Sequence, residues 1–164
     1  MQIIVTCGQG FSIGKDNERL VSIPADLKWI RRETEGGTVV VGRKTFEKMI
    51  GSPVLGTQKI LVLSTDKNYH PKGATVCHSV EELLKEVETE PSERVYCIGG
   101  ESLYQQLLPY CDTVHMTKVD YPYEANRYFP DLDNAEDWMV AEESEENTYF
   151  DLEYTYVRYE KVRQ

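Results

Sequence analysis

Short apolar runs rich in β-branched residues alternate with helical stretches along this chain, and this alternation restricts the fold more than any other feature. The runs predict strands at residues 3–7, 38–41, 60–63, 75–77, 95–98, 114–119, 139–142 and 154–159. Helical patterns separate several of them, at residues 25–33, 44–49, 80–87 and 102–108. Strands joined by helices imply crossover connections, and therefore a mainly parallel sheet with helices on both faces. No helix separates the last two strands, so we expect a C-terminal antiparallel hairpin.

Two of the helices carry start signals. Pro24 suits a first helical turn, where its missing N–H group has no cost, and Ser79 followed by Glu82 has the form of a capping box.

The length of 164 residues suits one compact domain over residues 1–164. No segment approaches the ~20 apolar residues that cross a bilayer, and the N-terminus has the pattern of a first strand rather than of a leader, so we expect a cytoplasmic protein.

Four scattered cysteines fit reduced packing residues. Because His70, His78 and His115 have no ligand-like spacing, we expect no metal.

The formal net charge of -10 argues against a nucleic-acid partner, because affinity for phosphate backbones comes largely from lysine and arginine. If the ligands are anionic, basic residues must be concentrated locally. The pairs Arg31-Arg32 and Arg43-Lys44 are therefore the places to look.

The acidic segment 136–146 has two interpretations. It resembles an interaction tail in charge, but strand-like runs enclose it, which favours the solvated flank of a hairpin.

Glycines follow two predicted strands in the arrangement that phosphate binding favours. Gly42 precedes Arg43 and Lys44, and Gly99-Gly100 precedes Glu101. Glycine lets backbone approach a ligand closely, although glycine at a strand end is more often only a turn. The two cations beside Gly42 suit an extra phosphate, such as the 2′-phosphate that distinguishes NADPH from NADH.

A Rossmann fingerprint is missing. The segment 8–14 looks similar, but its third glycine comes one position late and no helical pattern follows directly. A dinucleotide would therefore bind by another geometry.

Asp26 lies near the start of the first predicted helix, on one face with Ile30 and Glu33 and beside Leu27. A carboxylate on such an apolar surface can exchange a proton, or bind a planar amidine-like group through two hydrogen bonds. It can also simply complement the helix dipole in the first turn, and spacing alone favours this second interpretation.

Read together, these elements resemble bacterial dihydrofolate reductase over essentially the whole chain. Five motifs in register carry the resemblance: residues 13–17 (IGKDN), 23–27 (IPADL), 41–47 (VGRKTFE), 98–100 (IGG) with Tyr104, and 128–130 (YFP). The resemblance implies a three-layer α/β fold, with a mainly parallel eight-stranded twisted sheet, and a cleft where NADPH meets dihydrofolate.

The resemblance also implies roles for residues of the substrate site. Asp26 would hold the amidine edge of the pterin and promote protonation of N5 while hydride goes to C6, and Thr117 would hydrogen-bond to that carboxylate. The remaining substrate-binding residues would be Ile4, Val5, Leu27, Ile30 and Ile98.

For the cofactor, the resemblance implies a nicotinamide end, covered by a mobile loop at residues 15–20, and a phosphate end that includes a cis Gly99-Gly100 peptide. The residues expected to bind NADPH are Thr6, Ile13, Gly14, Gly42, Arg43, Lys44, Thr45, Leu63, Ser64, Thr65, Gly99, Gly100, Glu101, Ser102, Leu103 and Tyr104.

Three departures from the family pattern bear on function. Leu20-Val21 replaces a Pro-Trp pair whose tryptophan helps to order a water near the carboxylate, and Ile30 replaces an aromatic residue. The usual arginine for the glutamate carboxylate of the substrate is absent from residues 53–59, where the register offers Thr57 or Gln58. Lys59, Arg31 or Arg32 are the available replacements.

The leading hypothesis is thus a monomeric NADPH-dependent dihydrofolate reductase. A second is a related reductase of a pterin without a glutamate tail or of a ribosylamino-pyrimidine, which the missing arginine favours. A third, a non-catalytic nucleotide-binding protein, is disfavoured by the retained Asp26 and Thr117.

Overall fold

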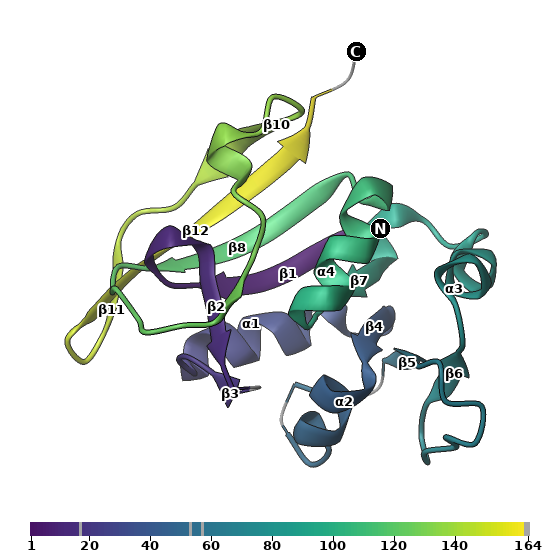
Figure 1. Cartoon of the computed structure of the whole chain (residues 1–164). Helices are drawn as coiled ribbons and strands as arrows, with labels where there is room; N and C mark the ends of the chain where they lie inside the picture. The colour runs from purple at the N-terminus through teal and green to yellow at the C-terminus, as the bar shows by residue number, and fades with distance from the viewer. Residues whose placement is uncertain (17, 53, 57, 163–164) are drawn as a thin grey trace.

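The computed structural model describes residues 1–16, 18–52, 54–56 and 58–162, and its main feature is a central sheet. Eight strands form its continuous path: β1 (Gln2–Cys7), β4 (Thr38–Gly42), β5 (Lys59–Leu63), β6 (Thr75–Cys77), β7 (Val95–Cys97), β8 (Thr113–Val119), β10 (Trp138–Glu143) and β12 (Leu152–Lys161). They lie in the order β10-β12-β8-β1-β7-β4-β5-β6 (Figure 1). All eight are the strands that the sequence predicts, within two residues at each end.

The sheet is mixed and mainly parallel. Strands β8, β1, β7, β4, β5 and β6 pair in parallel, so that Ile3 of β1 stands beside both Cys97 of β7 and Val114 of β8. Strand β12 pairs antiparallel with β8 and with β10, and a short strand β11 (Asn147–Tyr149) also pairs antiparallel with β12. The predicted parallel sheet and C-terminal antiparallel hairpin are confirmed.

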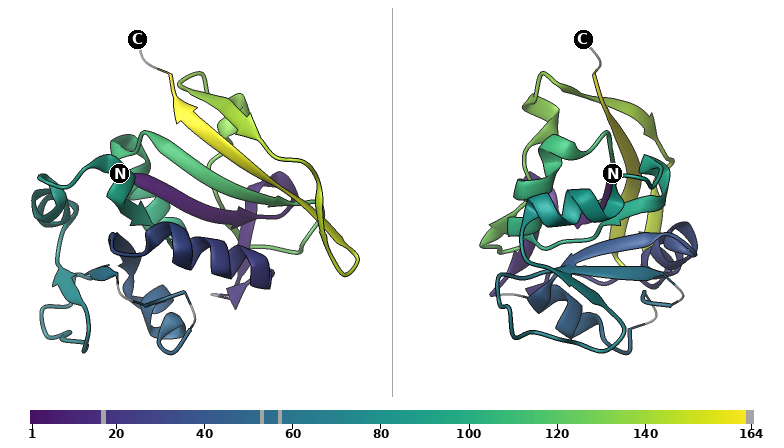
Figure 2. Two further views of the ribbon diagram at one scale, coloured as in Figure 1. Left: turned by 180° about the vertical axis from the view of Figure 1, so that it is seen from behind. Right: turned by 90° about the vertical axis from the view of Figure 1, so that its right-hand side faces the viewer.

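Helices cover both faces of the sheet, because its strands are apolar on both sides. Helices α1 (Pro24–Thr34) and α2 (Arg43–Met49) pack on one face, where Val39 and Val41 of β4 point. Helices α3 (Val80–Val87) and α4 (Glu101–Leu107) pack on the other, where Val40 points. Figure 1 shows α4 in front of the sheet, and the left view of Figure 2, seen from behind, shows α1 on the opposite face. The three layers predicted from the sequence are confirmed.

The two predicted helix starts are present, one of them modified. Pro24 is the first residue of α1. The Ser79 hydroxyl accepts a hydrogen bond from the Glu82 N–H group at 3.1 Å, as in a capping box. The Glu82 carboxylate accepts from the main-chain N–H group of His78 instead of that of Ser79, so the box is shifted by one residue.

A second, three-stranded sheet lies beside the first, and the sequence did not predict it. It consists of β2 (Ser12–Lys15), β3 (Glu18–Arg19) and β9 (Arg127–Tyr128) in the order β3-β2-β9. Segment 15–20, expected as a loop, thus contains part of a hairpin. Short 3-10 turns complete the described elements at Gln9–Phe11, Ser92–Arg94, Leu108–Tyr110 and Leu132–Asn134.

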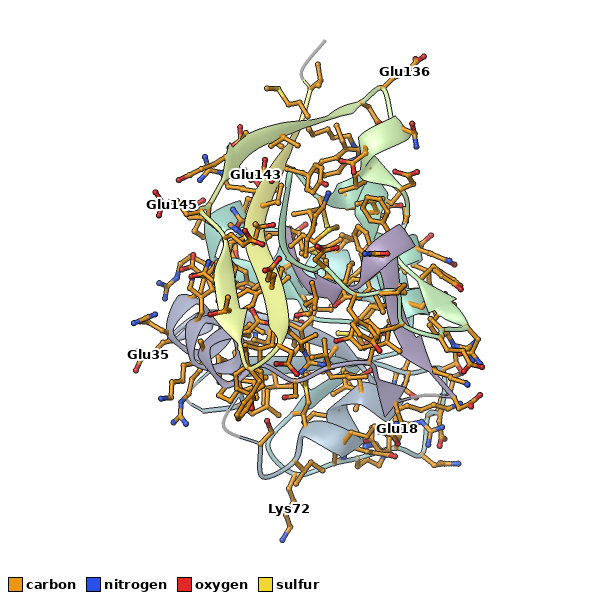
Figure 3. All side chains as sticks on the ribbon, turned by 90° about the vertical axis from the view of Figure 1, so that its left-hand side faces the viewer. Glu18, Glu35, Lys72, Glu136, Glu143 and Glu145 are labelled. Carbon is orange, nitrogen blue, oxygen red and sulfur yellow. The ribbon has the colours of Figure 1, made fainter. Side chains whose placement is uncertain are left out.

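The acidic segment 136–146 lies on β10 and the turn that follows it. The labelled side chains of Glu136 and Glu145 project from the surface (Figure 3). The interpretation as a solvated hairpin flank is confirmed.

All four cysteines are free and buried, as expected of packing residues. In the part of the chain that the structure describes, no helix is long and apolar enough to span a membrane.

The packing beneath α4 can be tested at Leu107, because its side chain is fully buried there. We expect Leu107→Ala to lower the free energy of unfolding by about 2–5 kcal/mol through lost burial and a residual cavity. Urea denaturation measures this change. Ile50→Ala, at a site that is 65% exposed, is the matched control and should stay within about 0.5 kcal/mol of the parent.

Candidate active site

Asp26 occupies the buried face of α1, in the first turn of the helix. Its side chain is 1% exposed, and the buried residues of α1 are Asp26, Ile30 and Thr34, which follow one another at helical spacing. Glu33, predicted on this face, is exposed, because a spacing of four residues from Ile30 brings Thr34 inward instead.

Two threonine hydroxyls satisfy the buried carboxylate. Thr117 Oγ1 donates to Asp26 Oδ1 at 2.7 Å, and Thr6 Oγ1 donates to Oδ2 at 2.6 Å. The threonines are register partners on the neighbouring parallel strands β1 and β8, which places the hydroxyls side by side. A carboxylate has about four acceptor positions, so two remain for a ligand. The expected Thr117 bond is present, whereas the Thr6 bond was not predicted.

An inner cavity of about 100 Å³ lies beside this group, between α1 and the ends of the strands. It is lined by Thr6 and by four of the predicted substrate residues: Ile4, Val5, Ile30 and Ile98. Met49 and Val54, which the sequence analysis did not select, add further apolar wall.

Three predicted substrate residues lie outside the lining of this inner cavity: Asp26, Leu27 and Thr117. Thr117 contacts Asp26 from the sheet, and half-buried Leu27 packs with the apolar cluster beneath α1. Leu27 comes directly after the buried Asp26 on α1, so its side chain points in a different direction around the helix.

The expected cis peptide between Gly99 and Gly100 is present, just after β7. Gly99 has φ +110°, and a Cβ there would lie 2.9 Å from the hydroxyl of Tyr104. That hydroxyl donates to the Ile4 carbonyl at 2.8 Å, while the Gly99 carbonyl accepts from the Gly42 N–H group at 2.8 Å. Glycine at this position thus lets α4, β1 and the end of β4 approach closely.

A larger outer groove of about 690 Å³ follows the carboxyl ends of β4, β5 and β7. Eleven of the predicted cofactor residues line it: Gly42, Arg43, Lys44, Thr45, Leu63, Ser64, Thr65, Gly100, Glu101, Ser102 and Leu103. Arg43, Lys44 and Arg127 bring positive charge to this groove on a chain that is acidic overall. The local concentration of cations that an anionic ligand requires is therefore present.

The inner cavity and the outer groove form one cleft. A pocket of about 130 Å³ joins them, with Ile13, Gly14 and Arg19 in its wall, and Thr45 and Gly100 line all three spaces. Ile13 also lines the inner cavity, together with Tyr104. The cleft thus collects side chains from both ends of the predicted cofactor site.

The outer groove also contains residues that sequence reasoning missed: His78, Ser79, Gln106 and Arg127. The sequence analysis identified Ser79 and Glu82 only as the start of a helix. Because the predicted strand ends at Cys77, His78 lies between that strand and the helix. Arg127 reaches the cleft through β9, whose attachment to α4 depends on the Tyr128 N–H group donating to Glu101 Oε2 at 2.7 Å. Because β9 is a short polar strand, the sequence contains no pattern that predicts its contact with α4.

Two tyrosines near Asp26 remain protonated. Burial, followed by the negative charge of Asp26, raises the pKa of Tyr156 to about 12. Complete burial raises the pKa of Tyr104, which keeps the hydroxyl donating to Ile4. Within the described residues, no group of three or more histidine, cysteine or acidic side chains is arranged to hold a metal ion.

The loop after α2 contains the two residues that were predicted to replace the missing arginine. Thr57, one of the two predicted replacements, lies outside the described residues. Gln58 is buried and supports the loop: its amide nitrogen donates to Thr34 Oγ1 at 2.8 Å and to the Val54 carbonyl at 2.9 Å, and its amide oxygen accepts from Gly56. The side chain of Gln58 is therefore a structural brace.

Arg31 of α1 lies against the same loop. A Cβ on Gly56 would lie 3.2 Å from both Nε and Nη2 of Arg31, so glycine leaves room for the guanidinium. The residue before Arg31, Ile30, lines the inner cavity, as does Val54 of the loop. Arg31 of α1 thus brings a positive charge close to the loop in which the usual arginine is absent.

Comparison with known proteins gives consistent matches over the chain. The family model described as dihydrofolate reductase matches residues 1–161. The dihydrofolate reductase of Bacillus subtilis is 36% identical over 153 residues, which cover 91% of this chain and 87% of that protein. The dihydrofolate reductase of Staphylococcus haemolyticus is 30% identical over 168 residues, covering 99% and 96%.

A solved structure agrees with these sequence matches. Dihydrofolate reductase from Enterococcus faecalis complexed with NADP(H) and RAB-propyl superimposes with a TM-score of 0.85 at 28% identity, covering 99% of this chain and 96% of that one.

Thr117→Val tests the hydroxyl pair, because valine has nearly the same shape but no donor. Asp26 would lose one of its two hydroxyl donors in a buried site, and we expect the free energy of unfolding at neutral pH to fall by roughly 1.5–3 kcal/mol. Thr148→Val, on an exposed position of β11, is the control. Equal stability of the two variants would contradict the role given to Thr117.

Proposed function

The chain belongs to the dihydrofolate reductase family, and we propose that its cleft reduces 7,8-dihydrofolate to 5,6,7,8-tetrahydrofolate with NADPH, using Asp26 as the acidic group that holds the reacting ring. The observation that carries this assignment to the site is the buried Asp26 carboxylate between Thr6 and Thr117, beside an apolar cavity that opens into a cation-lined groove.

Asp26 has the acceptor positions that this chemistry needs. With one hydroxyl on each oxygen, the carboxylate retains two positions for the N–H groups of a flat pterin amidine edge. Holding that edge fixes the ring in the inner cavity and promotes the protonation of N5. Val21 has no polar side-chain group, so Thr6 and Thr117 are the side chains that orient the carboxylate in the described part of the chain.

The outer groove suits a phosphorylated dinucleotide. Gly42 and Gly100 leave main chain accessible beside the cations Arg43 and Lys44, while Ser64 and Thr65 supply hydroxyl groups for an adenosine 2′-phosphate. The nicotinamide end would lie near Thr6, Ile13 and Gly14. NADPH, when bound, supplies the hydride that C6 receives. The protein's own contribution is distance, orientation and the exclusion of water.

Arg31 is the best placed residue for the glutamate tail of the substrate. It adjoins Ile30 in the cavity wall and lies against the loop at Gly56. A guanidinium can bind a carboxylate through two parallel hydrogen bonds, which a threonine or glutamine cannot do. This placement favours dihydrofolate over a pterin without a tail.

We further propose that residues 1–164 act as one domain, as a monomer, in the cytoplasm and without a nucleic-acid partner. One sheet receives strands from both ends of the chain, which favours a single domain. Four free thiols suit a reducing compartment, and the acidic balance of the chain disfavours phosphate backbones.

Asp26→Asn tests the acid. We expect turnover of dihydrofolate at neutral pH to fall by about two orders of magnitude or more, and by less at low pH, where more of the substrate is already protonated. Following NADPH oxidation as a function of pH measures both effects. Asp151→Asn, on the surface, is the control, and an Asp26→Asn enzyme with normal turnover would remove Asp26 from the mechanism.

Arg31→Gln tests tail recognition, and Lys28→Gln, at an exposed cation on the same helix, is its matched control. Loss of one charged hydrogen-bonding group should raise the KM for dihydrofolate by about one to two orders of magnitude and leave a tail-less dihydropterin unaffected. If Arg31→Gln changes neither substrate, the tail binds elsewhere. If the wild type reduces only the tail-less compound, the substrate assignment itself is wrong.

A further inference from the structure

Arg19 is a cation of the cleft that the mechanism above does not use. It belongs to the short strand β3, and it lines both the inner cavity and the pocket that joins this cavity to the outer groove. We propose that Arg19 is a specificity-determining residue, whose positive charge makes the cleft prefer NADPH over the oxidised form, NADP⁺. This inference rests on the proposed function, because it concerns the nicotinamide end of the same cleft.

The pairing of the second sheet accounts for the position of Arg19. Gly14 of β2 is the register partner of Arg19 on β3 and of Arg127 on β9. Cross-strand partners project from the same face of a sheet, and both arginines line the joining pocket. Gly14 adds no side chain between them, so this face leaves space beside the two arginines.

The acidic side chains of the joining pocket are already paired with other cations. Glu101 pairs with Arg127 at 3.9 Å, and Glu18 pairs with Lys48 at 3.0 Å. Among the residues that the structure describes, no carboxylate forms an ion pair with Arg19. An arginine keeps its charge in proteins, so Arg19 brings a fixed positive charge to the wall of the cleft.

This charge acts inside the inner cavity. Arg19 is the only charged residue in the lining of that cavity, within the described part of the chain. Burial raises the pKa of Tyr104, another residue of the lining, and the positive charge of Arg19 opposes that rise. A partly enclosed and mainly apolar space screens a charge less than open water does. A second positive charge is therefore disfavoured there.

The two forms of the cofactor differ in charge only at the nicotinamide ring, which is neutral in NADPH and positive in NADP⁺. Under the proposed function this ring lies near Thr6, Ile13 and Gly14, and the last two line the joining pocket together with Arg19. Arg19 thus repels the ring of NADP⁺ and not that of NADPH. After hydride transfer the same repulsion favours release of the oxidised cofactor.

Other charges of the cleft do not obscure this effect. Both cofactor forms carry the same phosphates, so contacts with Arg43 and Lys44 of the outer groove cancel in the ratio of the two Kd values. Asp26 attracts a positive ring, but its carboxylate already accepts from Thr6 and Thr117, and its contribution is the same in every variant at Arg19. The change in the ratio between variants therefore reports on Arg19.

Titration calorimetry with NADPH and NADP⁺ tests the proposal in wild type and in three variants of Arg19. In Arg19→Met and Arg19→Gln, which remove the charge, the ratio of the Kd for NADP⁺ to the Kd for NADPH should fall by about five- to tenfold. Exposure of Arg19 to solvent keeps the effect moderate. In Arg19→Lys, which keeps the charge, the ratio should stay within about twofold of the wild-type value.

Lys15→Met is the matched control. Lys15 is a cation on β2 of the same hairpin, pairs with Glu124 at 2.7 Å, and lies outside the lining of the inner cavity and of the joining pocket. Its removal should leave the ratio at the wild-type value.

Three results would overturn the inference. They are an unchanged ratio in the two uncharged variants, an equal loss of the ratio in Arg19→Lys, and an equal loss in Lys15→Met. Urea denaturation of each variant verifies its fold. If wild type binds NADPH and reduces dihydrofolate normally but the ratio does not depend on Arg19, only this inference fails. If wild type neither binds NADPH nor reduces dihydrofolate, the proposed function fails.

Discussion

The carboxylate of Asp26, held between the hydroxyls of Thr6 and Thr117, is the interaction on which the arrangement of the cleft depends. An unpaired charge in this position would be strongly destabilising, so the two strands must present their hydroxyls wherever the helix presents its acid. The same three residues connect α1 to β1 and β8, and the carboxylate keeps acceptor positions that the two hydroxyls do not use. Stability and chemistry therefore impose the same geometry on this part of the molecule.

The sheet explains why the rest of the cleft gathers around that point. In open parallel sheets, ligands bind beyond the carboxyl ends of the strands. Here Gly42 ends β4, Ser64 follows β5 and Gly99 lies just after β7, and their neighbours line the outer groove. Strands that are apolar on both faces supply two packed layers, which hold these loops at constant distances. A chain with a large negative charge can thus maintain a small positive groove.

Patterns in the sequence were enough to predict the eight strands on the continuous path of the central sheet and the four described α-helices. Strands β3 and β9 have only two residues each, all of them exposed, so neither a period nor an apolar run marks them, and the second sheet was missed. Asp26 was recognised through a motif, but its bond to Thr6 depends on strand register, which no local pattern contains. Gln58 suggested ligand binding because it occupies the position of an absent arginine, whereas burial gives it a structural role. His78 was missed because a single histidine carries no spacing signal.

The strand order has a consequence for how the protein is made. Among the strands of this sheet, β1 leaves the ribosome first, yet Ile3 pairs only with Cys97 and Val114, roughly 90 and 110 residues later. At ordinary rates of translation this delay is roughly 5 to 20 seconds, during which β1, a central strand, has no neighbour on either side. Strands β4, β5 and β6 are complete much earlier and adjoin one another. The nascent chain can therefore pair β4, β5 and β6 first, while the acid on α1 gains both threonine partners only after β8 emerges.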